Sequence, residues 1–128
     1  MAATTATLIG TGEVTSITPG TSGLPKLGDS FGVGYGVQGD PRWPQYPDLV
    51  NIQSSSLEVI VSFKHDASAP DVNLFQGTVT GINNDNPLEL GQPVAIYQEP
   101  SQNGMAYVSL EINPAQGGTQ WVTGGKKE

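Results

Sequence analysis

The alternation of apolar and polar positions along the chain predicts β-strands. In the stretch 57–63 every second residue is large and apolar, from Leu57 through Val59 and Val61 to Phe63. The positions between them hold a glutamate, an isoleucine and a serine. Successive side chains of a strand point to opposite faces, so the apolar set is expected to face the core.

Similar runs predict further strands, at 14–17, 31–37, 74–82, 88–98, 105–112 and 120–122. The run 31–37 alternates large side chains with glycine, which leaves one face of the strand bare. Asn103-Gly104 before the run 105–112 is a strong hairpin signal, although the connection 99–104 is longer than a two-residue turn. Glycine and proline recur too often for a helix.

About six to eight short strands separated by turn residues are typical of a β-sandwich or a β-barrel. The chain, residues 1–128, is expected to form one all-β domain. Residues 1–7 are expected to be an N-terminal arm and 123–128 a C-terminal tail. The N-terminal segment and the glycine-rich run 31–37 are expected at the sheet edges, where another chain could add a strand.

The composition argues against several function classes. Twelve acidic residues face five basic ones, giving a formal net charge of −7, so a nucleic acid is not an expected partner. The chain has no cysteine, hence no disulfide or thiolate metal site. It shows no secretion signal and no apolar run long enough to cross a bilayer, so no membrane association is expected. Only 13% of the residues are charged, about half the usual share, which suits wide contacts with other proteins.

Three patterns resemble parts of chemical sites. His65 with Asp66 and Asp71, or with Ser68, lacks the spacing of a metal site or a hydrolase relay. The stretch 34–39 matches G-x-G-x-x-G, but Asp-Pro follows where a dinucleotide fold begins a helix. The oxygen-rich turn 83–87 lacks the ligand spacing of a calcium loop. We therefore expect no metal, no cofactor and no catalytic residue.

The proline-rich loop 39–48 is the most distinctive segment. Three prolines stiffen it around Trp43 and Tyr46. Two interpretations stay open: a preorganised contact with a partner, or a Trp43 that folds back over one end of the core.

In its low charge, its abundance of Thr, Asn, Gln and Gly, and its short strands, the whole chain resembles the small cement or decoration proteins of tailed-bacteriophage capsids. The resemblance implies a symmetric homo-oligomer that is made in the host cytoplasm, resides in the virion and stabilises the shell by binding the major capsid protein. The expected contact residues are those of the arm and the loop: Thr4, Thr5, Ala6, Thr7, Trp43 and Tyr46.

Two alternatives remain. A carbohydrate- or receptor-binding module, such as a fibre tip, would use Trp43, Tyr46 and Trp121 as stacking faces, which should then be coplanar and exposed. A glycosidase would need two carboxylates flanking a cleft, for which Glu58 and Glu111 are candidates.

Overall fold

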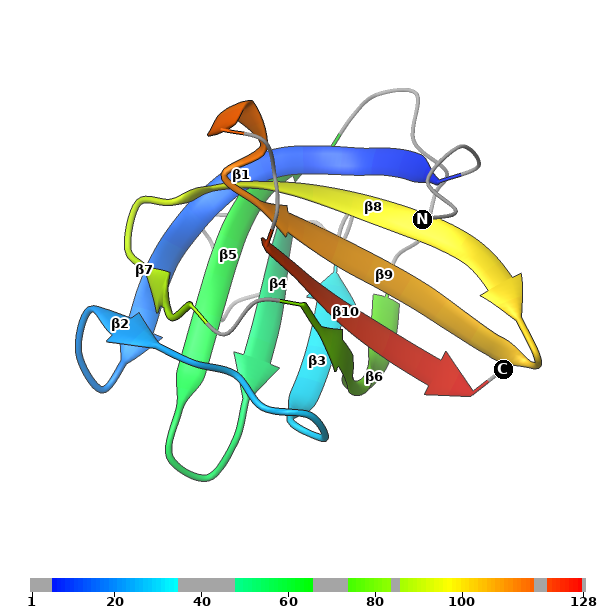
Figure 1. Ribbon diagram of the computed structural model, residues 1–128, viewed down its shortest axis with the longest axis horizontal. Helices are drawn as coiled ribbons and strands as arrows, with labels where there is room; N and C mark the ends of the chain where they lie inside the picture. Colours follow the sequence, from blue (N-terminus) through cyan, green and yellow to red (C-terminus); the bar gives the residue numbers. More distant parts are fainter. Residues whose placement is uncertain (1–5, 35–47, 66–73, 84–85, 117–119, 128) are drawn as a thin grey trace.

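The chain folds into a closed antiparallel β-barrel (Figure 1). The computed structural model describes residues 6–34, 48–65, 74–83, 86–116 and 120–127. The strands are β1 (Thr7–Thr18), β2 (Ser22–Gly23), β3 (Ser30–Gly34), β4 (Asp48–Gln53), β5 (Glu58–His65), β6 (Leu74–Ile82), β7 (Leu88–Glu89), β8 (Pro93–Gln102), β9 (Met105–Ile112) and β10 (Gln120–Lys127). A 3₁₀ turn spans Pro114–Gln116. The predicted all-β fold and its barrel option are confirmed.

Eight strands close the barrel in the order β1-β5-β4-β3-β6-β10-β9-β8. Every barrel strand therefore has two hydrogen-bonded neighbours. The expectation of a free edge at the glycine-rich run is wrong for its described residues 31–34, because β3 pairs with β4 and β6. Residues 1–5 of the N-terminal segment, the other expected edge, lie outside the described residues. Closure of this kind removes the unpaired backbone groups that make edge strands associate. The short strands β2 and β7 pair with each other at one end.

The alternation predicted for 57–63 is confirmed in β5. Val59 and Val61 are fully buried and Phe63 nearly so, whereas Glu58 on the other face is half-buried. Side chains from all eight strands fill the interior, as is usual for a barrel of this size. The largest fully buried ones are Phe31, Ile9, Ile52, Leu88, Ile96, Leu110 and Ile112. Leu88 of β7 adds to the same core.

The expected C-terminal tail is instead a wall of the barrel, as far as residue 127. β10 pairs with β9 from Gln120 to Lys127 and with β6 from Val122 to Gly125. Position 124 of this strand requires a glycine. A Cβ atom there would overlap the ring of Phe31, which is fully buried beneath it.

The hairpin signal at Asn103-Gly104 is confirmed, and the connection is shorter than expected. β8 continues to Gln102, which pairs with Met105. Both turn residues have positive φ, 53° at Asn103 and 76° at Gly104, as a two-residue hairpin of this hand requires.

Candidate functional site

The outer surface of the wall formed by β8, β9 and β10 is the candidate site. The three strands lie side by side in Figure 1, joined by β8–β9 and β9–β10 pairing. Alternation along β9 buries Val108, Leu110 and Ile112 and turns the residues between them outward. We call the half-buried outward residues of this wall the aromatic face: Tyr97, Glu99, Met105, Tyr107, Glu111 and Trp121.

Tyr97 and Trp121 form the centre of the aromatic face. Their ring centroids are 5.9 Å apart and their planes are tilted by 42°. Between their strands lies Ser109, a small buried residue that pairs with Tyr97 on one side and with Thr123 on the other. The Ser109 and Thr123 hydroxyl oxygens are 3.2 Å apart, within hydrogen-bond distance. A small residue on β9 therefore leaves space for the two rings to meet above it.

Glu111 supplies the charge beside these rings. It lies directly opposite Trp121 in the β9–β10 pairing. Burial raises the pKa of Tyr97, and the nearby Glu111 carboxylate raises it further, both by its charge and by accepting a hydrogen bond from the phenol. Tyr97 is thus held protonated by its surroundings.

Tyr107 continues the face toward the β8–β9 turn. It lies opposite Glu99 on one side and Gly125 on the other. A Cβ atom at Gly125 would lie only 3.0 Å from Cε1 of Tyr107, so the tyrosine ring covers the bare glycine backbone. Met105 and Lys127 are opposite each other at the end of the same strands.

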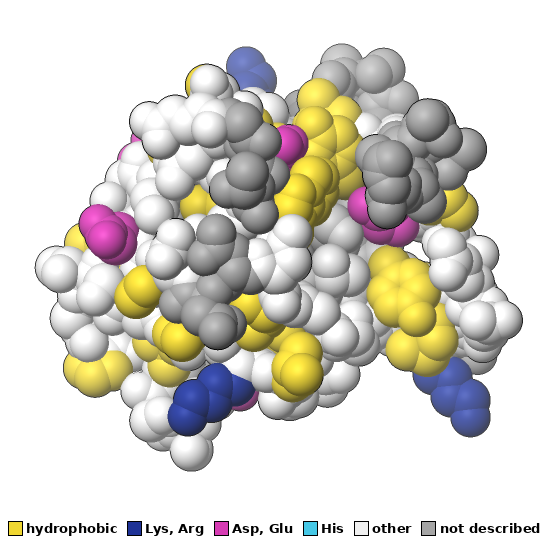
Figure 2. Space-filling model, in the orientation of Figure 1, with side chains coloured by type: hydrophobic (Ala, Val, Ile, Leu, Met, Phe, Trp, Pro, Cys, Tyr) yellow, Lys and Arg dark blue, Asp and Glu magenta, His cyan; other side chains and the backbone are white. Residues whose placement is uncertain are grey.

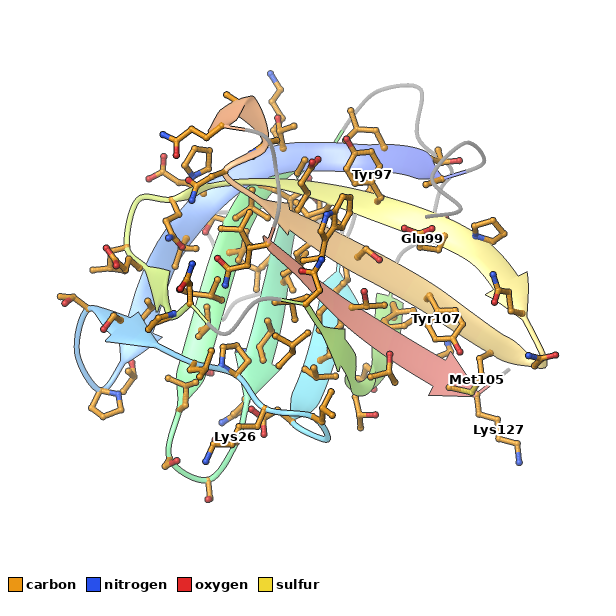
Figure 3. The ribbon with its side chains drawn as sticks, in the orientation of Figure 1. Lys26, Tyr97, Glu99, Met105, Tyr107 and Lys127 are labelled. Carbon is orange, nitrogen blue, oxygen red and sulfur yellow. The ribbon has the colours of Figure 1, made fainter. Side chains whose placement is uncertain are left out.

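Figure 3 shows how labelled residues of the face are arranged along the wall. In Figure 3, Tyr97, Glu99, Tyr107, Met105 and Lys127 follow one another along the wall. In Figure 2, separate groups of hydrophobic side chains (yellow) lie over the region of these strands, with acidic groups (magenta) beside them. Aromatic residues and methionine are enriched at the centres of protein interfaces, with charged residues kept to the rim.

Of the residues expected to contact a partner, the structure describes Ala6 and Thr7. Thr4, Thr5, Trp43 and Tyr46 lie outside the described residues. Ala6 is half-buried just before β1. Thr7 is exposed but belongs to the barrel wall, because it pairs with Gln98 of β8. It is therefore part of a barrel strand and not of an arm.

Metal binding and glycoside hydrolysis are the other kinds of site chemistry to compare with the described residues. Among the residues that the structure describes, no three His, Cys, Asp or Glu side chains gather closely enough to hold a metal ion. Glu58 and Glu111, the pair considered for a glycosidase, project outward from β5 and β9. Those strands are not neighbours in the barrel. No helix in the described ranges is long and apolar enough to cross a membrane.

Trp121 and Glu111 are candidate site residues from the sequence, Trp121 for sugar stacking and Glu111 as a glycosidase carboxylate, whereas Tyr97, Tyr107 and Glu99 are not. Tyr107 and Glu111 alternate with the core residues of β9, so their outward direction was visible in the sequence. Their contact with Tyr97 and Trp121 was not visible, because it depends on the pairing of three strands.

Comparison of the chain with protein-family models, with curated proteins and with solved structures finds no match.

Proposed function

We propose that this protein is a structural subunit of a virus particle, a capsid decoration protein that docks on the major capsid protein through the aromatic face. The observation that carries the proposal is the row of Tyr97, Trp121, Tyr107 and Met105 on the outside of a barrel whose interior is already filled. These residues are not needed to complete the core, and they are the types that make up the centres of interfaces.

Closure of the barrel supports docking through side chains. Strand addition needs an unpaired strand edge, and each of the eight described barrel strands pairs with two neighbours. For the described strands, side chains that project from a wall are therefore the favoured contact. The β8–β10 wall offers three aromatic rings in the space of three adjacent strands.

The geometry favours protein docking over sugar stacking on this face. A saccharide platform needs rings that lie in one plane and face solvent. Tyr97 and Trp121 are tilted by 42° and are half-buried, with Glu111 beside them. Tilted, half-buried rings of this kind fit an irregular protein surface better than they fit a flat sugar ring.

The low charge of the chain supports an assembly role. Charged groups lose hydration when an interface closes, and only 13% of these residues carry a charge. Apart from Glu99 and Glu111 on the aromatic face, a wide contact with a shell, or between copies of the chain, therefore meets little desolvation penalty. The composition, dominated by small and neutral polar residues, is the feature shared with decoration proteins.

The test is whether the protein is a component of a virus particle. Particles from the source organism are banded by density and analysed by mass spectrometry. The purified chain is then mixed with shells that lack it, and co-sedimentation is measured for the native sequence and for Tyr107→Ala. The proposal expects the chain in the particles and weaker sedimentation of the variant. A chain that is abundant in the lysate but missing from the particles would overturn it.

A further inference from the structure

We propose that the opposite wall of the barrel carries a second binding site, a groove that takes a neutral hexopyranose. This goes beyond the proposed docking function and does not depend on it. The groove lies on the outer side of β3, with β4, β5 and β6 contributing to its sides, and has a volume of about 620 Å³. In the closed strand order, β4 and β3 lie across the barrel from β9, so this groove and the aromatic face point in opposite directions.

The groove exists because Gly32 has no side chain. In the strand pairing, Gly32 lies directly between Asn51 of β4 and Gln76 of β6. Neighbouring strands are about 4.8 Å apart, so the two amide side chains rise on either side of a bare strip of backbone about 10 Å across. Ser30, one step along the same face, lies in the same way between Gln53 and Thr78.

The groups that line the groove are those that bind hydroxyl groups. Three amides and two hydroxyls can each donate and accept hydrogen bonds. They belong to Asn51, Gln53, Gln76, Ser30 and Thr78. Vicinal hydroxyls of a sugar are also donors and acceptors at once, so an amide can satisfy two of them together. The volume lies within the usual range for small-ligand sites, roughly 300–1,000 Å³.

Glu58 holds the Asn51 side chain at one side of the groove. The Asn51 Nδ2 group donates a hydrogen bond of 2.9 Å to Glu58 Oε2, which leaves the other carboxylate oxygen to accept a ligand hydroxyl. A single carboxylate in a chain of net charge −7 repels phosphate and other anions. It is too little for a divalent cation, which needs six or more oxygen ligands. A neutral polyhydroxyl ring is the class that uses every group present.

The exposed backbone at Gly32, which forms the floor of the groove, suits the C–H face of a sugar ring. Sugars present C–H groups on the face of the ring, and these pack against apolar or flat surfaces. At Gly32 the strand backbone is open, since a Cβ atom there would meet only the Phe75 carbonyl oxygen among described atoms. The hydroxyl rim of the ring would then meet the amides while its C–H face rests on the strand.

The test is a titration of the isotope-labelled full chain with glucose, galactose and N-acetylglucosamine, followed by NMR. We expect shifts at the Gly32 backbone amide and at the side-chain amides of Asn51 and Gln76, with a dissociation constant of about 1 mM for at least one sugar. Gly32→Val should abolish these shifts, because its methyl groups fill the floor. The fold should persist, since a Cβ at Gly32 meets only the Phe75 carbonyl oxygen, at 3.7 Å, among described atoms.

A matched pair of variants separates groove binding from a general surface effect. Gln76→Ala removes one amide from the groove and should weaken binding about five- to tenfold. Gln102→Ala removes an exposed amide of β8 and should leave it unchanged. The proposal is overturned if none of the sugars shifts the groove signals at about 50 mM, well above the expected dissociation constant. It is equally overturned if the shifts survive in Gly32→Val or map to the aromatic face.

Discussion

Tyr97 and Trp121 meet across the outer surface of β9, although β8 and β10 do not pair with each other. Their ring centroids are 5.9 Å apart because Ser109, the residue of β9 between their strands, is small. The pair thus ties three strands together from outside the core. It also presents two aromatic edges at the centre of the face that we propose for docking.

Truncating this pair should affect docking more than folding. Trp121→Ala is expected to weaken binding to capsid shells about 30-fold or more, the effect of losing a central aromatic contact worth about 2 kcal/mol. The free energy of unfolding should fall by only about 1–2 kcal/mol, since the side chain is half-buried and its partner is a single ring. Co-sedimentation and urea denaturation measure the two effects.

Leu27→Ala is the control for that experiment. Leu27 is 66% exposed and lies outside the aromatic face, so its truncation tests whether any exposed apolar side chain matters equally. Equal loss of shell binding in both variants would contradict a specific role for the Tyr97–Trp121 pair.

Stability should decline in alkaline solution partly through Tyr97. Burial and the Glu111 carboxylate raise its pKa above the ordinary value of 10.0. The folded state then holds the phenolic proton more tightly than the unfolded state. This contribution is fully present below pH 10.0 and is lost as the pH rises from there through the folded-state pKa. Urea denaturation at several pH values above and below this point should show the decline.

Two variants identify the origin of that decline. Tyr97→Phe has no phenol to ionise and should lose stability less steeply with rising pH. Glu111→Gln removes the charge that raises the pKa, so the ultraviolet titration of Tyr97 should move back toward 10.0 without reaching it, because burial remains. An unchanged alkaline decline in Tyr97→Phe would show that other groups are responsible.

The local structure of the strands could be predicted from the sequence, but their arrangement could not. The period of two in β5 correctly assigned Val59 and Val61 to the core. Strand order depends on contacts between residues far apart in the chain, such as β1 with β8, for which local alternation holds no information. For this reason the edge expected at the glycine-rich run was wrong over the described residues of β3.

Glycine residues explain why the C-terminal strand and the groove were not predicted from the sequence. Gly124 and Gly125 lie in the segment 123–128, which the sequence predicts as a tail, and glycine is a weak strand former. In the barrel they are required, one by the ring of Phe31 and the other by Thr80 and Tyr107. At Gly32 the bare face predicted from alternation is present, but its flanking amides come from β4 and β6 and needed the register to be known.

Two glycine substitutions should separate tight from open positions. Gly124→Ala is expected to destabilise the fold by about 1–3 kcal/mol or more, because the new methyl group overlaps the Phe31 ring in a filled core. Gly32→Ala should be neutral or stabilising by about 0.5–1 kcal/mol, because alanine loses less chain entropy on folding and has space at this position. Thermal unfolding of both variants against the native chain provides the measurement. Similar losses at both positions would contradict the packing described around Phe31.

The strongest test of the barrel interior is a charge in β5. Val61→Asp places a carboxylate where the native side chain is fully buried, with apolar neighbours and no cation among the core residues described. The expected loss exceeds about 4 kcal/mol, enough to unfold a domain of ordinary stability. Lys64→Asp, three positions along the strand and exposed, should leave folding intact. Circular dichroism and solubility distinguish the two outcomes, and a well-folded Val61→Asp would show that β5 does not face a closed core.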